Sequence, residues 1–164
     1  MDIGKHWKTI HTLFEESYMS SLHYAIATVN EDGSPHVTPI AALFLRENKT
    51  GFYFEEFSVN MARNLNRSPR ICVLAVNSDK AFWINSLTAG KCETPPSVRL
   101  IGTVGERREA TGEEIAMWQE RVAFARGIKG YDLIWRDLRM VRDICFDSFE
   151  PVLLGEMTKE LWSE

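Results

Sequence analysis

Cysteine and histidine, the side chains that most often carry chemistry, are few in this sequence and form no recognised catalytic or metal-binding motif. The three cysteines lie far apart, with no C-x-x-C spacing, at Cys72, Cys92 and Cys145. Cys72 and Cys145 lie within apolar runs, which predicts burial, whereas Cys92 lies in a loop-like segment that favours exposure. We therefore expect no catalytic cysteine and no metal site. The odd cysteine count indicates a reducing, cytoplasmic compartment.

The four histidines form two groups in the sequence. His6 and His11 lie in a segment with helical spacing and are expected to be solvated. His23 and His36 flank a predicted turn, so they can approach each other across two strands. Ser-His-Asp, H-E-x-x-H, P-loop and G-x-G-x-x-G patterns are absent. The sequence gives no support to a hydrolase, a metalloprotease or a dinucleotide-binding fold.

Composition excludes several broad classes of protein. The chain has 164 residues, 45% of them hydrophobic, which suits one globular domain over residues 1–164. The formal net charge of −4 argues against a general nucleic-acid binder. No apolar stretch approaches the roughly 20 residues that a membrane-spanning helix needs. The first residues lack the basic and apolar regions of a secretory signal.

The elements that must position any site begin with an amphipathic helix over residues 1–20. Ile3, Trp7, Ile10 and Phe14 recur at helical spacing, so this helix is expected to pack on the rest of the domain. The pattern then changes to short apolar or alternating runs. The predicted strands are 23–29, 35–45, 51–54, 71–76, 81–84, 98–104, 142–146 and 152–155. The first three are expected to form a meander, and 71–76 to be buried on both faces.

Three further helices are expected between these strands. Residues 58–67 form a short helix that Ser68-Pro69 ends. Thr111 and Glu114 make a capping box that starts a second helix, with Gly127 as its stop. Residues 131–138 form a third. Since strands and helices do not alternate regularly, the fold class is mainly β: an antiparallel barrel of six or more strands with an N-terminal helix and peripheral helices.

The segment 23–76 resembles a known family in the order and spacing of its motifs. After the strand–turn–strand comes Ala62-Arg63-Asn64-Leu65, then Ser68-Pro69-Arg70 and the apolar strand 71–76. This arrangement is similar to the pyridoxamine 5'-phosphate oxidase-like, FMN-binding split-barrel superfamily. The resemblance implies a split barrel that forms a homodimer, with FMN in two clefts at the dimer interface.

The resemblance also implies which residues contact the cofactor. The strand after the first turn would supply a flat apolar wall for the isoalloxazine ring, and Trp83 or Trp135 can cap the cavity. The short helix that follows would receive the phosphate. The implied cofactor-binding residues are Val37, Thr38, Pro39, Ile40, Phe54, Glu55, Ser58, Asn60, Met61 and Arg63.

The chain departs from the family where the flavin phosphate is usually held. Relatives often carry arginine and lysine on the second strand, but residues 38–43 hold no cation. Ser58, Asn60, Arg63 and the N-terminus of the short helix remain for the phosphate, and Glu55 and Glu56 oppose it unless they point away. Arg99 can enter the partner's cleft.

These features lead to one leading hypothesis and two alternatives. The leading hypothesis is an FMN-dependent oxidoreductase that transfers a hydride through flavin N5 to or from an unidentified small molecule, without an obligatory catalytic side chain. The first alternative is a dimeric binding or sensing protein for haem, a deazaflavin or another planar ligand, for which a histidine can serve as a haem ligand. The second is a split barrel that has lost its cofactor and acts through its interface. Pyridoxamine phosphate oxidase activity is not expected, because residues 156–164 lack the family's substrate segment.

Overall fold

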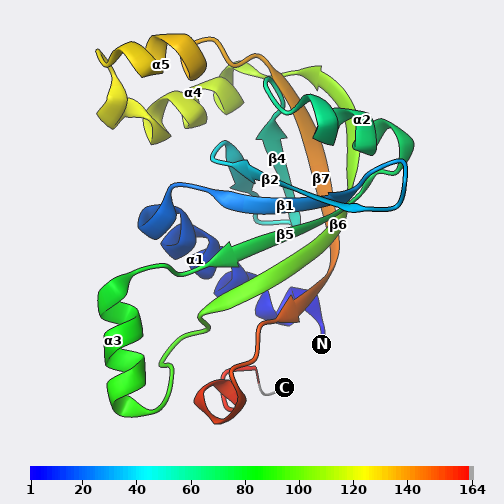
Figure 1. Ribbon diagram of the computed structural model, residues 1–164. Helices are drawn as coiled ribbons and strands as arrows, with labels where there is room; N and C mark the ends of the chain where they lie inside the picture. Colours follow the sequence, from blue (N-terminus) through cyan, green and yellow to red (C-terminus); the bar gives the residue numbers. More distant parts are fainter. Residues whose placement is uncertain (163–164) are drawn as a thin grey trace.

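Seven strands form one antiparallel sheet in the computed structural model, which describes residues 1–162 (Figure 1). Their order across the sheet is β2-β1-β5-β6-β7-β4-β3. The strands are β1 (Tyr24–Val29), β2 (Pro35–Ile40), β3 (Leu43–Leu45), β4 (Thr50–Phe54), β5 (Arg70–Val76), β6 (Ser97–Glu109) and β7 (Met140–Pro151).

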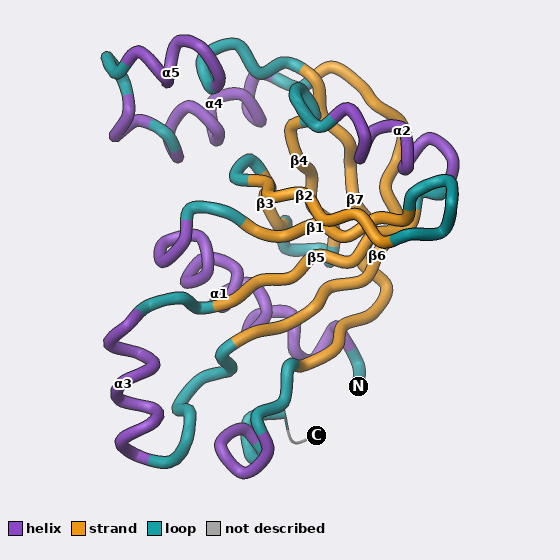
Figure 2. Tube along the Cα trace, viewed as in Figure 1, coloured by secondary structure: helices purple, strands orange, loops and turns teal. Residues whose placement is uncertain are grey.

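The two outermost strands of this sheet are neighbours in the sequence. Only Ala41 and Ala42 separate the end of β2 from the start of β3. Consecutive Cα atoms are about 3.8 Å apart, so these two edges meet within about 11 Å. The sheet therefore curls into a barrel that is left open along this junction (Figure 2). We call residues 41–42 the β2–β3 junction. The predicted split barrel with peripheral helices is confirmed.

The junction corrects two predictions. The run 35–45 is two strands, because the chain changes partners within it: Ile40 pairs with Tyr24, whereas Leu43 pairs with Tyr53. The predicted meander is also wrong, since the β3–β4 hairpin pairs with β7 at the other end of the sheet. A continuous apolar run does not reveal such a change of partner.

Helix α3 (Lys80–Ala89) replaces the predicted strand 81–84. The Asp79 side chain accepts a hydrogen bond from the Phe82 amide at 2.7 Å, and Gly90 ends the helix with a left-handed backbone. These two caps favour a helix, although the apolar run 81–84 within it is also typical of a short strand. The predicted strand 152–155 is also wrong, because β7 ends at Pro151 and a 3₁₀ turn follows at Gly155–Thr158.

Helix α1 (Ile3–Ser21) lies against the sheet, as its spacing predicted. Its apolar stripe joins the main core through Ile10 and Phe14, which meet buried side chains such as Val73 and Leu100. A second, smaller core lies at the other end of the barrel.

The second core lies beneath α4 (Gly112–Arg121) and α5 (Lys129–Ile134), which together form the α4–α5 lobe. The predicted capping box is confirmed, with Thr111 and Glu114 exchanging hydrogen bonds between side chain and backbone. Trp118 and Val122 are buried against Phe52, Phe54 and other side chains of the sheet. Helix α2 (Val59–Arg67) lies near β1, at the same end of the molecule as the lobe but on the other side of it in Figure 1.

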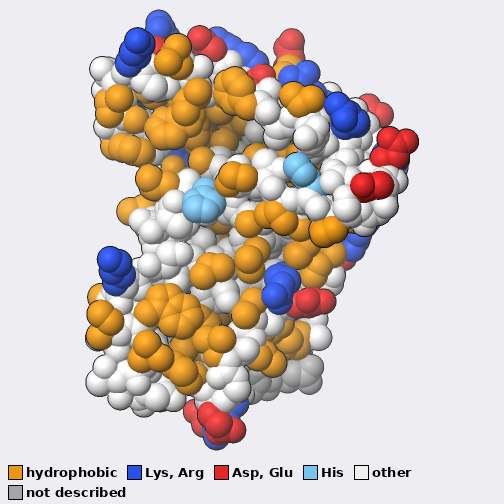
Figure 3. Space-filling view, in the orientation of Figure 1, with side chains coloured by type: hydrophobic (Ala, Val, Ile, Leu, Met, Phe, Trp, Pro, Cys, Tyr) orange, Lys and Arg blue, Asp and Glu red, His pale blue; other side chains and the backbone are white. Residues whose placement is uncertain are grey.

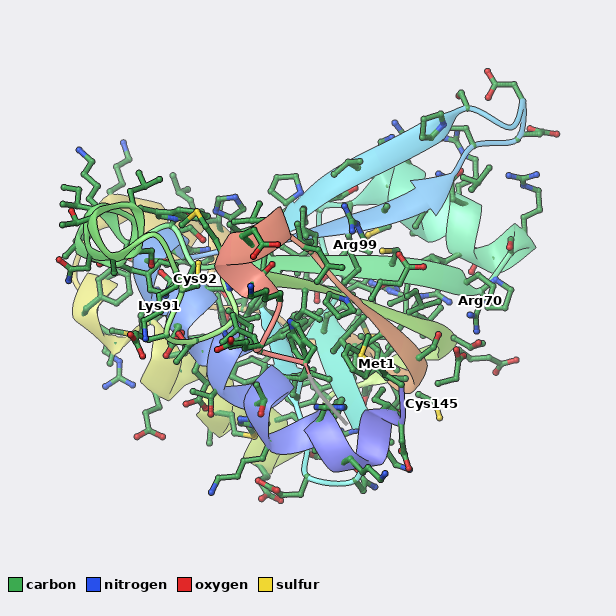
Figure 4. All side chains as sticks on the ribbon, turned by 90° about the horizontal axis from the view of Figure 1, so that it is seen from below. Met1, Arg70, Lys91, Cys92, Arg99 and Cys145 are labelled. Atoms are coloured by element: carbon green, nitrogen blue, oxygen red, sulfur yellow. The ribbon has the colours of Figure 1, made fainter. Side chains whose placement is uncertain are left out.

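Burial and strand register correct further predictions. Strand β5 alternates, with Ile71, Val73 and Ala75 buried and the intervening side chains half-buried. Cys92 is buried, whereas Cys145 is exposed and Cys72 is half-buried; Figure 4 shows Cys92 and Cys145 on opposite sides of the molecule. His36 lies across from Thr28, so it does not pair with His23. Within residues 1–162, no helix is long and apolar enough to cross a membrane, and no cluster of side chains is arranged to hold a metal ion.

A four-residue ionic cluster anchors the α4–α5 lobe to the sheet. Arg46 and Arg108 both contact Glu114 and Asp143, at 2.6 to 3.0 Å. Glu114 is buried, so its charge depends on these partners. Hydrogen bonds from Arg108 above all hold the pKa values of Glu114 and Asp143 below their ordinary values of 4.5 and 3.8.

These lowered pKa values predict acid sensitivity of the fold. A carboxylate with a lowered pKa stabilises the folded state above its ordinary pKa, and this stability is lost as the pH falls through the folded-state value. Below about pH 4.5 we therefore expect the Tm of the natural chain to fall more steeply than that of Glu114→Gln. Thermal unfolding between about pH 7 and about pH 3 measures both slopes. Equal slopes would show that Glu114 does not carry the effect.

Candidate cofactor site

A pocket of about 450 Å³ lies between the β2–β3 junction and the α4–α5 lobe. We call it the junction pocket. The end of β2, from Thr38 to Ile40, and the two junction alanines form one wall. Trp118, Trp135 and Leu138 form the opposite wall. Small alanine side chains allow a flat ligand to approach the backbone, and the tryptophans offer aromatic surface against it.

The aromatic wall is held in place by its own contacts. Trp118 is 1% exposed, and its indole Nε1 donates to the Trp135 carbonyl at 2.9 Å. The two rings meet edge to face, with centroids 5.9 Å apart. Because Trp118 lies on the helix that the capping box starts, the fold presents this wall without a ligand.

The Thr38 hydroxyl is the polar feature of the junction pocket that the protein leaves unsatisfied. Thr38 Oγ1 is buried and has no hydrogen-bond partner among residues 1–162. A buried hydroxyl without a partner costs about 1–3 kcal/mol, so such atoms usually bind something. The protein covers this hydroxyl, so a ligand with a polar edge would become its partner only after the Thr38 side chain turns toward the pocket.

A smaller pocket of about 240 Å³ adjoins the first at the N-terminus of α2. We call it the α2 pocket; it shares Glu56 and Ser58 with the junction pocket. Ser58 is the N-cap residue of α2, yet its side chain makes no capping hydrogen bond. The Val59 amide donates to the Phe57 carbonyl at 3.1 Å, so the Ser58 hydroxyl and the next amides of the first turn remain available to an anion.

Both glutamates at this position have protein partners. The buried Glu55 carboxylate binds Arg142 Nε through both oxygens at 2.9 Å and accepts the Tyr53 hydroxyl at 2.8 Å. Burial, and then the charge of Glu55, raise the pKa of Tyr53 above its usual range. Glu56 accepts two backbone amides, at 2.7 and 2.8 Å. Both carboxylates are thus held within the protein.

Arg107 is the cation of the α2 pocket that is not tightly paired. Its guanidinium is 3.7 Å from both Glu55 and Glu56, and its side chain is 45% exposed. Arg142 also lines this pocket but is committed to Glu55, Asn66 and the Gly105 carbonyl. Arg107 can therefore turn toward a bound anion, whereas Arg142 cannot without leaving Glu55.

The structure brings together some of the residues that the sequence placed at the cofactor. Those that line the junction pocket are Thr38, Pro39, Ile40, Phe54 and Ser58, and Glu55 lines the α2 pocket. Met61 is fully buried in the core, and Val37 is 60% exposed. Asn60 and Arg63 are exposed and line neither pocket.

Sequence reasoning missed Arg107, Trp118 and Asn66 as pocket residues. Trp118 lies on a helix that the sequence predicted, but nothing in the sequence showed that the buried face of this helix borders a cavity. Arg107 follows a register shift in the β6–β7 ladder, between Val104 and Arg107. Such a shift decides which side chains face the pocket and leaves no clear sequence signal.

Comparison with known families agrees with this geometry. The family model of pyridoxamine 5'-phosphate oxidase matches residues 11–145, most of the chain. The chain belongs to this family. Membership in the pyridoxamine 5'-phosphate oxidase-like, FMN-binding split-barrel superfamily accounts for the curled antiparallel sheet. No curated protein matches the chain.

Solved structures similar in fold to this chain belong to proteins that are named for different ligands. An FMN-binding protein from Syntrophomonas wolfei has 14% identity and a TM-score of 0.57, over 92% of this chain and 94% of that one. An F420 reductase has 14% identity and a TM-score of 0.54, over 84% and 95%. HutZ, a haem storage protein from Vibrio cholerae, has 17% identity and a TM-score of 0.52, over 84% and 90%. At these identities the likeness concerns the fold.

Proposed function

We propose that this protein binds FMN, with the isoalloxazine ring in the junction pocket and the phosphate in the α2 pocket. The observation that carries the proposal is the aromatic-walled junction pocket, which adjoins a second pocket at the N-terminus of α2. A flavin combines a flat ring with a polar edge and a phosphate, which matches this pair of pockets. The FMN-binding fold relative supports the same assignment.

The residues that line the junction pocket and the α2 pocket fit FMN. Trp118 and the β2–β3 junction would hold the ring between them, and Thr38 would hydrogen-bond its polar edge. Ser58, the first amides of α2 and Arg107 would hold the phosphate. One arginine with helix amides replaces the richer set of cations that relatives often carry.

The activity that follows is that of a flavin-dependent oxidoreductase acting on a small molecule. Flavin N5 is the hydride-transferring atom of this cofactor, so the protein's task is to bind, orient and exclude water. Glu56 is the one titratable side chain that lines the junction pocket among the described residues, and it is held by two backbone amides. We therefore assign no acid or base.

Comparing FMN with riboflavin tests the two halves of the site separately. Arg107→Gln is expected to weaken FMN binding about tenfold and leave riboflavin binding unchanged, because riboflavin lacks the phosphate. Thr38→Val is expected to weaken both ligands several-fold, since both carry the ring. Flavin fluorescence titration of the purified protein measures the dissociation constants, with Arg139→Gln as the matched surface control.

The same titration with a deazaflavin and with haem separates the alternatives. No histidine lines the junction pocket among residues 1–162, which favours the flavin over haem there. A haem complex that forms while FMN fails to bind would overturn the proposal and select a haem-binding protein. Failure of all three ligands would select a protein that acts without a cofactor.

We also propose that two copies of the chain form a dimer. Figure 3 shows hydrophobic side chains gathered on one face, over the α4–α5 lobe, the sheet and α3. Ile84 and Leu87 on α3 are 62% and 66% exposed, and Leu133 in the lobe is 68% exposed. Monomers rarely leave so many large apolar side chains uncovered on one face.

Light scattering measures the mass of the assembly directly. The natural chain is expected at twice 18.8 kDa, and Ile84→Glu/Leu87→Glu is expected to shift it toward one copy. Glu31→Lys, at the tip of the β1–β2 hairpin, is the control for a charge change on an exposed loop. A variant that keeps the dimer mass would show that α3 lies outside the interface.

A further inference from the structure

A third pocket, of about 480 Å³, lies between α1 and α4 beside β3. We call it the α1–α4 pocket. Its apolar lining comes from α1, β1, β3 and α4. Among these side chains are Phe14, Tyr24, Phe44, Leu45 and Met117. Helix α4 separates it from the junction pocket, since Met117 and Arg121 line this pocket whereas Trp118 lines the other. The cofactor proposal does not use it.

Arg121 is the notable side chain of the α1–α4 pocket. Its guanidinium carbon lies 3.6 Å from the centre of the Phe44 ring and 4.4 Å from that of Tyr18. Nη1 donates to the Leu43 carbonyl at 2.5 Å and to the Ala41 carbonyl at 3.4 Å. Among residues 1–162, no carboxylate forms an ion pair with it. A largely buried guanidinium held only by carbonyls and ring faces is an incompletely satisfied charge.

The remaining nitrogens of Arg121 open toward the pocket. Nη2 and Nε have no hydrogen-bond partner among the described residues, and neither is among the atoms that are sealed from solvent. They form one edge of the planar fork that arginine uses to bind a carboxylate through two hydrogen bonds. Burial lowers the pKa of Arg121, but an arginine side chain stays charged at neutral pH.

Tyr18 supplies a second unsatisfied polar group. The residue is 8% exposed, lines the same pocket and packs its ring against Arg121. Its hydroxyl has no hydrogen-bond partner among residues 1–162, unlike that of Tyr24, which donates to the Phe14 carbonyl at 3.0 Å. The free edge of the Arg121 guanidinium and the Tyr18 hydroxyl thus line one apolar cavity, and neither has a hydrogen-bond acceptor among the described residues.

The charges at the mouth of the pocket limit the ligand. Glu15 and Glu120 are exposed lining residues, and Glu15 lies 3.7 Å from His11. A ligand with a second anionic group would meet these carboxylates, whereas a single carboxylate at Arg121 lies deeper. The lining of the pocket therefore favours a ligand with a single negative charge and an apolar body.

We propose that the α1–α4 pocket binds a small monocarboxylic acid with an apolar body, whose carboxylate is held by Arg121 and the Tyr18 hydroxyl. The ring and alkyl portion of such a molecule would contact Phe44, Leu45 and Met117. This site is independent of the flavin, so the acid binds the protein with or without FMN.

Calorimetric titration with three related probes tests the proposal. The probe 3-phenylpropionate carries one carboxylate, phenylsuccinate carries two, and phenethylamine carries a similar apolar body with a cation. We expect saturable binding of 3-phenylpropionate, at least tenfold weaker binding of phenylsuccinate, and none of phenethylamine. Equal binding of the acid and the amine would overturn the proposal, because the carboxylate would then not be recognised.

Variants on α4 locate the probe. Arg121→Lys keeps the charge but removes the fork, and Met117→Trp fills the cavity without touching the arginine; each is expected to weaken 3-phenylpropionate at least tenfold. Arg126→Gln, nearby on the lobe, is the matched control and is expected to bind normally. Circular dichroism confirms that each variant is folded. Unchanged binding in both α4 variants, or no saturable binding of 3-phenylpropionate to the natural chain, would overturn the proposal.

Discussion

Replacing Arg142 by methionine is expected to lower the free energy of unfolding by about 3–5 kcal/mol. Arg142 and Glu55 are 5% and 3% exposed, and each is the other's principal charged partner. The substitution leaves the Glu55 carboxylate buried beside the Tyr53 hydroxyl, with only the half-exposed guanidinium of Arg107, 3.7 Å away, as a charged partner. A buried charge without its counter-ion costs far more than the ion pair itself contributes. Urea unfolding, followed by tryptophan fluorescence, measures the loss.

Two further variants separate burial from charge. Adding Glu55→Gln to Arg142→Met is expected to recover a large part of the lost stability, because no net charge is then buried. Arg70→Met removes a surface ion pair with Asp147, whose side chains are both about half exposed, and is expected to cost at most about 1 kcal/mol. If both single variants were equally destabilised, burial would not explain the effect.

Trp118→Ala is expected to cost about 3–5 kcal/mol, since it removes the largest fully buried side chain of the fold. The cavity would open between the sheet and the α4–α5 lobe, where Trp118 contacts Phe54 and Trp135. It would also remove the aromatic wall of the junction pocket. Denaturant unfolding measures the stability, and flavin titration below the unfolding transition measures the pocket.

Graded substitutions show whether packing is responsible. Trp118→Phe keeps most of the apolar contact but removes the hydrogen bond to the Trp135 carbonyl, and should cost about 1 kcal/mol for that bond plus a smaller packing loss. Trp83→Ala, on the sparsely contacted α3, is the control for losing a tryptophan and is expected to cost less than Trp118→Ala. An equal loss at Trp83 would contradict the central position given to Trp118.

Local signals in the sequence predicted those parts of the fold that local physics determines. The apolar stripe of α1 and the capping box of α4 were both correct because each depends on residues within a few positions. Residues 81–84 were wrongly predicted as a strand because the four apolar residues were given more weight than Asp79 and Gly90, which mark the two ends of α3. The β2–β3 break could not be predicted, since it depends on where β7 pairs.

The candidate site divides in the same way. Thr38 and Ser58 were predicted correctly as pocket residues because the resemblance to the family supplied the order of the strand and the short helix on which they lie. Arg107 and Arg142 lie 52 and 87 residues after Glu55 in the sequence. Only the register of β4, β6 and β7 brings them together, and side-chain types alone do not encode that register.

The β2–β3 junction also sets the order in which the molecule can be completed. The β1–β2 and β3–β4 hairpins lie next to each other in the chain, yet β4 finds its other neighbour only when residues 140–151 have been made. Until then, the edges of β4 and β6 that later pair with β7 are open to other chains. Closure thus depends on contacts of long sequence separation, which fold slowly. A chain cut before Met140 would lack the strand that joins both halves of the sheet, and such fragments should aggregate rather than fold.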